Sequence, residues 1–132
     1  MIEFFEPMVP PPATHNDLVP VSDSRGRARI VKSQALKAAE AKWEAHLARF
    51  APPSPLRGPL RADLRLCWPT EGKHPQGTPK DTKPDSDNVE KTFWDVCEGL
   101  GYFAAGDQQV ADKRVAKMWA DPAGVYLRLE EI

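Results

Sequence analysis

The sequence predicts an α+β fold: a single domain over residues 1–132, with a small mixed β-sheet and two main helices packed on it. Residues 33–50 and 87–100 lack proline and carry apolar residues at helical spacing. Residues 59–68 alternate apolar and polar side chains, as a half-buried strand does. A chain of 132 residues with 41% hydrophobic residues can bury one modest core. The expected order is two strands, a helix, a strand, a helix and two strands, with the helices on the sheet.

In the N-terminal half, residues 1–13 are expected to form an extended, proline-rich lead-in. The turn sequence Ser-Asp-Ser-Arg-Gly at 22–26 joins 17–21 and 27–32 into a hairpin. Ser33 is placed to cap the first helix, and Ala51-Pro52-Pro53 ends it. The apolar stripe of that helix is Leu36, Ala39, Trp43, Leu47 and Phe50.

In the C-terminal half, the strand at 59–68 is followed by a polar, basic stretch over 69–84, rich in glycine and proline. We expect this stretch to be a flexible loop. The second helix, 87–100, ends at Gly99 and Gly101, and strands are expected at 109–118 and 124–130. Its apolar stripe is Val89, Phe93, Val96, Cys97 and Leu100. Trp43 and Trp68 are expected in the core, and Trp94 and Trp119 in the core or at a dimer interface.

The net charge of −1 conceals an uneven distribution. Residues 24–84 hold 13 basic and five acidic residues (+8), whereas 85–132 hold five basic and ten acidic residues (−5). Such a division suits a protein that binds a polyanion on one surface and a cation on another, although ordinary charge variation also produces it. No apolar run is long enough to cross a bilayer, and we expect no secretory signal. Two cysteines then indicate a reducing cytoplasm, with Cys67 and Cys97 as thiols.

Several common chemistries lack their motifs. The sequence has no Cys-x-x-Cys pair for a structural zinc ion, no Gly-x-Ser-x-Gly nucleophile turn and no phosphate-binding P-loop. His15, His46 and His74 are scattered along the chain. These absences leave carboxylates as the candidates for chemistry.

The most informative stretch is Lys83-Pro84-Asp85-Ser86-Asp87-Asn88-Val89-Glu90-Lys91. In an extended chain Asp85 and Asp87 project to the same side, where two carboxylates can hold Mg²⁺ through oxygen ligands. Lys91, one turn along the helix, can contact a phosphate. A structural interpretation competes: Asp87 and Glu90 have the spacing of a helix capping box, and Lys91 and Asp95 that of a surface ion pair.

A second acidic element, Gly106-Asp107-Gln108-Gln109-Val110, precedes the strand expected at 109–118. Short connections can bring Asp107 back beside the start of the second helix. Three aspartates and Lys91 would then form a compact metal site. Asp112 is either a fourth acid of this site or a solvent-facing strand residue.

Together these motifs resemble the RusA family of Holliday junction resolvases, which are typically encoded by phages and prophages. The resemblance is strong over 83–118. The N-terminal half matches only in layout, including Asn16 and the pair Lys32-Ser33. The chain departs from the family pattern at Gly106, where the family usually has aspartate, and the linker before Asp107 is about one residue longer. The residues that carry the resemblance are Lys83 to Asn88, Lys91, Asp95, Gly99, Gly106, Asp107, Gln109, Val110, Lys117 and Met118.

The resemblance implies a homodimer that binds four-way DNA junctions and nicks two strands symmetrically, using Mg²⁺ or Mn²⁺. It maps the essential acids onto Asp85, Asp87 and Asp107, which would also be the metal ligands, and the essential lysine onto Lys91. Basic side chains of the hairpin and the loop are candidates to follow the DNA backbone, or else form a solvated basic face. They are Arg25, Arg27, Arg29, Lys32, Lys73, Lys80 and Lys83.

The first hypothesis is therefore a Mg²⁺-dependent junction endonuclease of DNA recombination and repair, in the cytoplasm of a bacterium or a phage-infected cell. Clearing branched phage DNA is an alternative role. A second hypothesis, kept open by Gly106, is a junction-binding protein that has lost catalysis. A third is a proline-rich interaction module whose acids merely cap a helix.

Overall fold

A five-stranded mixed sheet forms one layer of the structure, a computed structural model that describes residues 1–13 and 17–132; His15 and Asn16 lie outside the described residues. The strand order is β1-β7-β4-β6-β5. Strands β4 and β6 are parallel, and the other neighbours are antiparallel. The strands are β1 (Ile2–Pro7), β4 (Leu60–Trp68), β5 (Thr78–Pro79), β6 (Val110–Trp119) and β7 (Gly124–Glu131).

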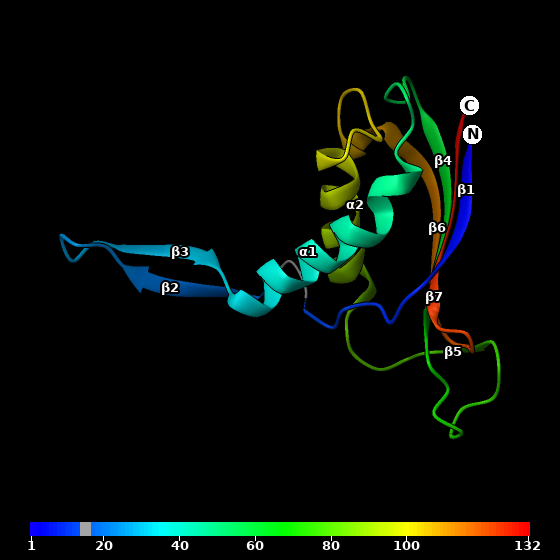
Figure 1. Cartoon of the computed structure of the whole chain (residues 1–132), viewed down its shortest axis with the longest axis horizontal. Helices are drawn as coiled ribbons and strands as arrows, with labels where there is room; N and C mark the ends of the chain where they lie inside the picture. Colours follow the sequence, from blue (N-terminus) through cyan, green and yellow to red (C-terminus); the bar gives the residue numbers. More distant parts are fainter. Residues whose placement is uncertain (14–16) are drawn as a thin grey trace.

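Two helices, α1 (Gln34–Leu47) and α2 (Ser86–Gly99), cover one face of this sheet (Figure 1). A 3₁₀ turn, η1 (Ala48–Phe50), extends α1. The predicted cap is confirmed, because the Ser33 hydroxyl accepts the Leu36 N–H at 3.1 Å. The apolar stripe of α1 is buried as expected, apart from the half-buried Phe50. The predicted α+β class, with two helices on a mixed sheet, is confirmed.

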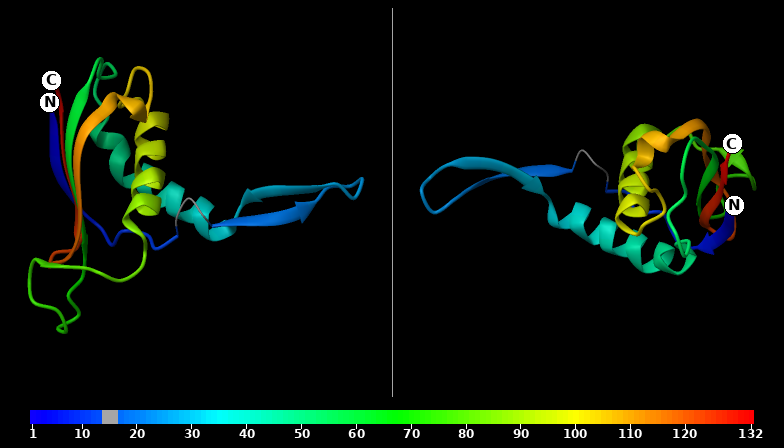
Figure 2. Two further views of the ribbon diagram at one scale, coloured as in Figure 1. Left: turned by 180° about the vertical axis from the view of Figure 1, so that it is seen from behind. Right: turned by 90° about the horizontal axis from the view of Figure 1, so that it is seen from above.

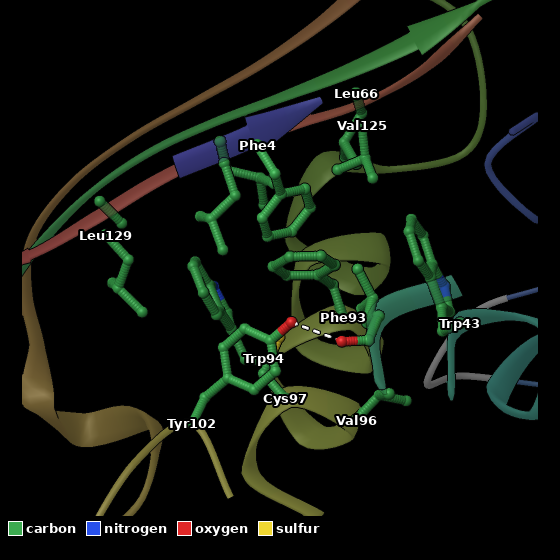
Figure 3. Packing of buried hydrophobic residues seen from close by; sticks show 14 of the residues in the cluster. Phe4, Trp43, Leu66, Phe93, Trp94, Val96, Cys97, Tyr102, Val125 and Leu129 are labelled. Carbon is green, nitrogen blue, oxygen red and sulfur yellow. Dashed lines mark hydrogen bonds between the residues drawn. The ribbon is translucent and has the colours of Figure 1, made fainter. Parts of the chain in front are cut away.

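Aromatic side chains fill the space between the helices and the sheet (Figure 3). Trp43 of α1 meets Phe93 of α2 edge to face, with ring centroids 5.3 Å apart. The buried Tyr102 hydroxyl donates to the Leu47 carbonyl at 2.7 Å, which ties the segment after α2 to the end of α1. Trp43, Trp68 and Trp94 are all buried, and Cys97 lies in the same core as a free thiol.

The predicted hairpin is present as β2 (Leu18–Ser22) and β3 (Ala28–Lys32). It extends away from the sheet and helices and leads into α1 (Figures 1 and 2). Asp23 shapes its turn, because one carboxylate oxygen accepts the backbone N–H groups of Arg25 and Arg27 at 2.8 and 2.9 Å. The hairpin thus presents its side chains to solvent, including the exposed Ile30.

The first half of the extended lead-in expected over 1–13 forms a strand that the sequence did not predict: β1 is an edge strand of the main sheet, paired with β7. Phe4 and Glu6 point inward, and Glu6 is only 6% exposed. The Glu6 carboxylate binds His46 Nδ1 at 2.8 Å and the Arg49 guanidinium. Strand β1 is therefore fastened to α1 and η1 by a buried charge as well as by Phe4.

The stretch 69–84 contains more structure than the predicted loop. Its strand β5 pairs with the end of β6, and the His74 ring stacks on Trp119 with centroids 3.8 Å apart. A short 3₁₀ helix, η2 (Asp107–Gln109), leads into β6. Among the helices of the described residues, none is long and apolar enough to cross a membrane.

Candidate active site

Two acidic residues stand where the chain enters α2. The Asp85 carbonyl accepts the Val89 N–H at 3.1 Å, so Asp85 is the N-cap by backbone, but its carboxylate makes no capping hydrogen bond. Asp85 Oδ1 instead accepts a hydrogen bond from Lys83 Nζ at 2.7 Å. The carboxylate is about half exposed, so a ligand in solvent can reach it.

The competing structural interpretation, a capping box from Asp87 to Glu90, is wrong. The helix begins at Ser86, and no side chain caps it. Glu90 turns to other partners: its Oε1 accepts the indole N–H of Trp94 at 3.0 Å and pairs with Lys113 Nζ at 2.5 Å. The carboxylates of Asp85 and Asp87 therefore make no capping hydrogen bond to the helix.

Asp87 borders two neighbouring pockets. The first has a volume of about 670 Å³ and is lined by both Asp85 and Asp87, together with the basic residues Lys80, Lys83 and Lys117. The second, of about 150 Å³, brings Asp87 together with Lys91 and Asp107. The predicted acids and lysine therefore line one connected stretch of surface, with Asp87 in the middle.

Lys91 is held between two carboxylates. Its Nζ lies 3.0 Å from Asp95 Oδ1 and 3.0 Å from Asp107 Oδ2. The hydrogen bond to Asp95, followed by the one to Asp107, raises the pKa of Lys91 well above its usual range. Both sequence interpretations of Lys91 are thus present at once: it forms the surface pair with Asp95, and it also reaches Asp107 from the distant motif.

The donor types suit a hard divalent cation, because Mg²⁺ prefers carboxylate oxygens and commonly uses one or two of them with water and substrate phosphates. The expected cluster of three aspartates is not formed, and the described residues contain no group of three acidic, histidine or cysteine side chains able to hold a metal ion. Two of the aspartates instead form salt bridges, Asp107 with Lys91 and Asp85 with Lys83. The residues fit an ion held by the Asp85 and Asp87 pair rather than a closed cage.

Asp112 does not belong to this site. Strand alternation places it beside Arg61 on the sheet face that is turned away from α2, and its Oδ2 accepts from Arg61 Nε at 2.9 Å. The adjacent Lys113 points the other way, to Glu90 of α2. The solvent-facing alternative for Asp112 is therefore confirmed.

The basic residues of the hairpin are distant from the acids in sequence. They lie on the β2–β3 hairpin, which extends away from the sheet and the helices (Figure 2). Arg27 pairs with Asp23 at 2.8 Å and Lys32 with Glu40 at 2.9 Å, yet both side chains are more than half exposed. Arg25 and Arg29 are exposed as well. All four are placed where a large partner can reach them.

The loop lysines divide into two kinds. Lys73 and Lys83 are exposed. The expectation that Lys80 is an exposed loop cation is wrong, because Lys80 is only 8% exposed. Its Nζ lies 4.3 Å from the centroid of the Trp119 ring and donates to the Lys83 carbonyl at 2.7 Å. Lys80 is thus committed to contacts inside the protein.

Residues 9–130 match the family model of the endodeoxyribonuclease RusA, which is nearly the whole chain. The chain belongs to the RusA family. No curated protein matches it. As a RusA-family member it is an endodeoxyribonuclease that acts on branched DNA, and nucleases of this kind generally use a divalent metal ion. The resemblance of the motifs over 83–118 is thereby confirmed at the level of the family.

The departure of this RusA-family chain at Gly106 has a backbone explanation. Gly106 has φ +122° and ψ 177°, a conformation that is almost restricted to glycine. A Cβ atom there would lie 2.5 Å from Gln108 Oε1 and 3.0 Å from Glu98 Oε1. Both oxygens end flexible side chains that can move aside, so the positive φ, which strains any residue with a Cβ atom, is what disfavours aspartate here.

Gln109 is a RusA-motif residue whose role was not apparent from the sequence. Its Nε2 donates to the carbonyls of Leu56 and Gly58, each at 3.0 Å, and its Oε1 accepts the Ala105 N–H at 2.5 Å. These bonds fasten the segment that carries Asp107 to the segment before β4. The sequence signals were its place in the motif and a polar side chain at the predicted start of a strand.

Lys117 is another residue of the RusA motif to which the sequence assigned no role. Alternation along β6 places it on the helix-facing side with Val115 and Trp119. Its Nζ donates to the carbonyls of Thr82 and Pro84, next to Asp85. A lysine that alternates with apolar residues on a strand was the available signal.

Proposed function

We propose that this RusA-family chain is a Mg²⁺-dependent Holliday junction resolvase, which makes paired symmetric nicks during DNA recombination and repair. The observation that carries the proposal is the placement of the acids. Asp85 and Asp87 line one pocket, and Asp87, Lys91 and Asp107 line its neighbour. Carboxylates that can hold a metal ion, beside a charged lysine on one connected surface, are groups that can promote phosphodiester hydrolysis.

Asp85 and Asp87 would hold the divalent ion, with Mn²⁺ as a substitute for Mg²⁺. Both side chains border the larger pocket, which is open enough to admit a phosphate and water with the ion. When bound, such an ion supplies Lewis-acid catalysis and activates water for hydrolysis of the phosphodiester. Asp107, which borders the neighbouring pocket, is assigned to the same set of essential acids.

Lys91 supplies positive charge beside these acids. Its raised pKa keeps the ammonium protonated throughout the physiological range. Asp95 and Asp107 accept two of its three N–H donors and fix its direction, which leaves the third donor for a phosphate oxygen. Lys91 therefore would stabilise charge on the scissile phosphate, and Asp107 would orient Lys91.

The exposed basic side chains would follow the DNA backbone. Arg25, Arg27, Arg29 and Lys32 of the hairpin are assigned to one stretch of DNA, and Lys73 and Lys83 to DNA near the acids. A homodimer suits this substrate, because a two-fold axis places two equivalent sites on opposed strands of a symmetric junction. Because the RusA-family resemblance is to enzymes typically encoded by phages and prophages, the enzyme would act in the cytoplasm of a bacterium or phage-infected cell.

Substitution of the two pocket aspartates tests the proposal. Asp85→Asn and Asp87→Asn each keep the shape of the side chain and remove its charge. We expect either substitution to abolish Mg²⁺-dependent nicking of a synthetic four-way junction, while junction binding in EDTA persists. Asp112→Asn is the matched control, since that acid lies on the far face of the sheet and should retain full nicking.

Nicking and binding are measured on the same labelled junction, by denaturing gel and by gel shift. Wild-type nicking rates in both pocket variants would contradict the assignment of Asp85 and Asp87 to the metal. Loss of nicking in Asp112→Asn as well would show that general charge, rather than this pocket, controls the reaction.

A further inference from the structure

Two lysines, Lys80 and Lys117, flank the short segment that leads into Asp85. Lys80 directly follows β5, and Lys117 lies on β6, and their backbones are joined by the hydrogen bond from Lys80 N to Lys117 O at 3.0 Å. Both side chains line the same pocket as Asp85 and Asp87. Neither lysine takes part in the proposed reaction.

Their ammonium groups bind the segment itself rather than acidic side chains. Lys117 Nζ donates to the Thr82 carbonyl at 2.5 Å and to the Pro84 carbonyl at 2.6 Å. Lys80 Nζ donates to the Thr82 hydroxyl at 2.6 Å and to the Lys83 carbonyl at 2.7 Å. The carbonyls of three consecutive residues before Asp85 are therefore each held by a lysine.

Burial makes these contacts costly to lose. The Lys80 ammonium lies over the Trp119 and Trp68 rings, with centroids at 4.3 and 5.4 Å. Desolvation lowers the pKa of both Lys80 and Lys117, and within the described residues neither forms a salt bridge. A desolvated ammonium needs hydrogen-bond acceptors, and the carbonyls of residues 82–84 supply them.

We infer that Lys80 and Lys117 are positioning residues, which clamp the backbone of residues 82–84 and thereby hold the Asp85 carboxylate at the pocket it shares with Asp87. The inference rests on the proposed function, in which Asp85 binds the ion. It differs from a role in DNA binding, because both ammonium groups are directed at the protein's own segment 82–84 and Lys80 is only 8% exposed. Outer partners that orient a metal ligand typically change metal affinity by about 10-fold to 100-fold when removed.

The test compares Lys117→Met and Lys80→Met with Lys37→Met, an exposed lysine on α1. Hydrogen exchange of residues 81–88 in the metal-free protein is the first measurement. We expect faster exchange of this segment in both clamp variants, with unchanged protection of β4 and of the control variant. Lys117→Arg, which keeps a cationic donor, should restore part of the protection and guards against a variant that simply fails to fold.

Mn²⁺ affinity, measured by calorimetry with the metal alone, is the second measurement. We expect Mn²⁺ binding to weaken by about 10-fold to 100-fold in the clamp variants. Junction affinity in EDTA and KM for the junction should stay at wild-type values, while kcat falls and is partly recovered by excess metal. This division between kcat and KM distinguishes positioning of Asp85 from contact with DNA.

Three outcomes would overturn the inference. Unchanged exchange and Mn²⁺ affinity together with weaker junction binding would make these lysines phosphate contacts. Loss of protection throughout the sheet would reduce them to general structural residues. Wild-type values of hydrogen exchange, metal binding and nicking in Lys80→Met and Lys117→Met would show that the clamp has no effect. If the wild-type protein itself neither binds Mn²⁺ nor nicks junctions, the proposed function fails, and the exchange of residues 81–88 alone decides whether the clamp exists.

Discussion

At the scale of single residues, glycine at position 106 has two explanations: the loss of a catalytic acid, or a local backbone conformation that favours glycine. A RusA-like pattern with aspartate at this position suggested that the chain had lost an acid. The positive φ shows that this backbone conformation strongly favours glycine. Gly106 is therefore part of how this chain presents Asp107.

Restoring the family residue should consequently harm the protein. We expect Gly106→Asp to lower the free energy of unfolding by about 1 to 3 kcal/mol, the usual range for a forced backbone conformation, and to give no gain in Mg²⁺-dependent nicking. Urea unfolding and the junction assay measure the two effects. The control is Gly99→Ala, where no atom lies within 4 Å of the new methyl group. A stable Gly106→Asp protein with faster nicking would identify Gly106 as a lesion instead.

Sequence reasoning located the candidate residues better than it located their surroundings. The spacing of Asp85, Asp87 and Lys91 around a helix start, with Asp107 before a strand, was enough to bring them to one surface. It could not show that Lys80 is buried, because that depends on Trp68 and Trp119 meeting from two strands. Nor could it show that Asp85 pairs with Lys83 and Asp107 with Lys91 in place of a three-carboxylate cluster.

At the scale of elements, periodicity predicted the helices and the central strands but missed β1. The reason is Glu6, a charged residue at an inward-facing position, which interrupts the apolar alternation that indicates a strand. Its partners, His46 and Arg49, are about 40 residues away in sequence. Pairing over that distance leaves no local signal, so the strand appeared to be a proline-rich extended segment.

Glu6 also makes a pH prediction. Burial raises the pKa of Glu6, but the hydrogen bonds from His46 and Arg49 outweigh it and hold the pKa below the ordinary value of 4.5. Such a group stabilises the fold above pH 4.5, and this contribution is lost as the pH falls through the lowered pKa. We expect Glu6→Gln to lower the free energy of unfolding by about 1 to 3 kcal/mol at pH 6, and the difference from wild type to shrink below pH 4.5.

Urea unfolding between pH 6 and pH 3 measures this difference. Glu131→Gln, an exposed acid at the end of β7, is the control and should behave as wild type throughout. A difference between wild type and Glu6→Gln that stays constant down to pH 3 would contradict the assigned pKa direction.

At the scale of the whole molecule, charge and shape are distributed together. The acids of the candidate site lie on the body of the protein at the start of α2, and the basic hairpin extends from it (Figure 1). A polyanion bound by the hairpin would therefore lie away from most of the acidic residues. It would approach them only at the two pockets lined by Asp85, Asp87 and Asp107. Under the proposed function, this arrangement would let a protein of net charge −1 bind DNA through its hairpin.

The salt dependence of junction binding tests this division. A plot of log affinity against log salt concentration has a negative slope, and each lost phosphate contact makes it less steep by about 0.9. The double variant Arg25→Ala, Arg29→Ala should therefore have a slope that is less steep by about 1 to 2. The matched control is Arg114→Ala/Arg128→Ala, which removes the same charge from the sheet face turned away from the helices. Gel shifts in EDTA over a range of salt concentrations give the slopes. Equal flattening in both double variants would contradict a specific role for the hairpin.

Whether the protein is a metal-dependent resolvase is tested by incubating the wild-type protein with a mobile four-way junction labelled on each strand in turn. We expect paired nicks at symmetric positions on two opposed strands in Mg²⁺, and none in EDTA. Binding of the junction without nicks in both Mg²⁺ and Mn²⁺, or equal nicking in EDTA, would contradict it.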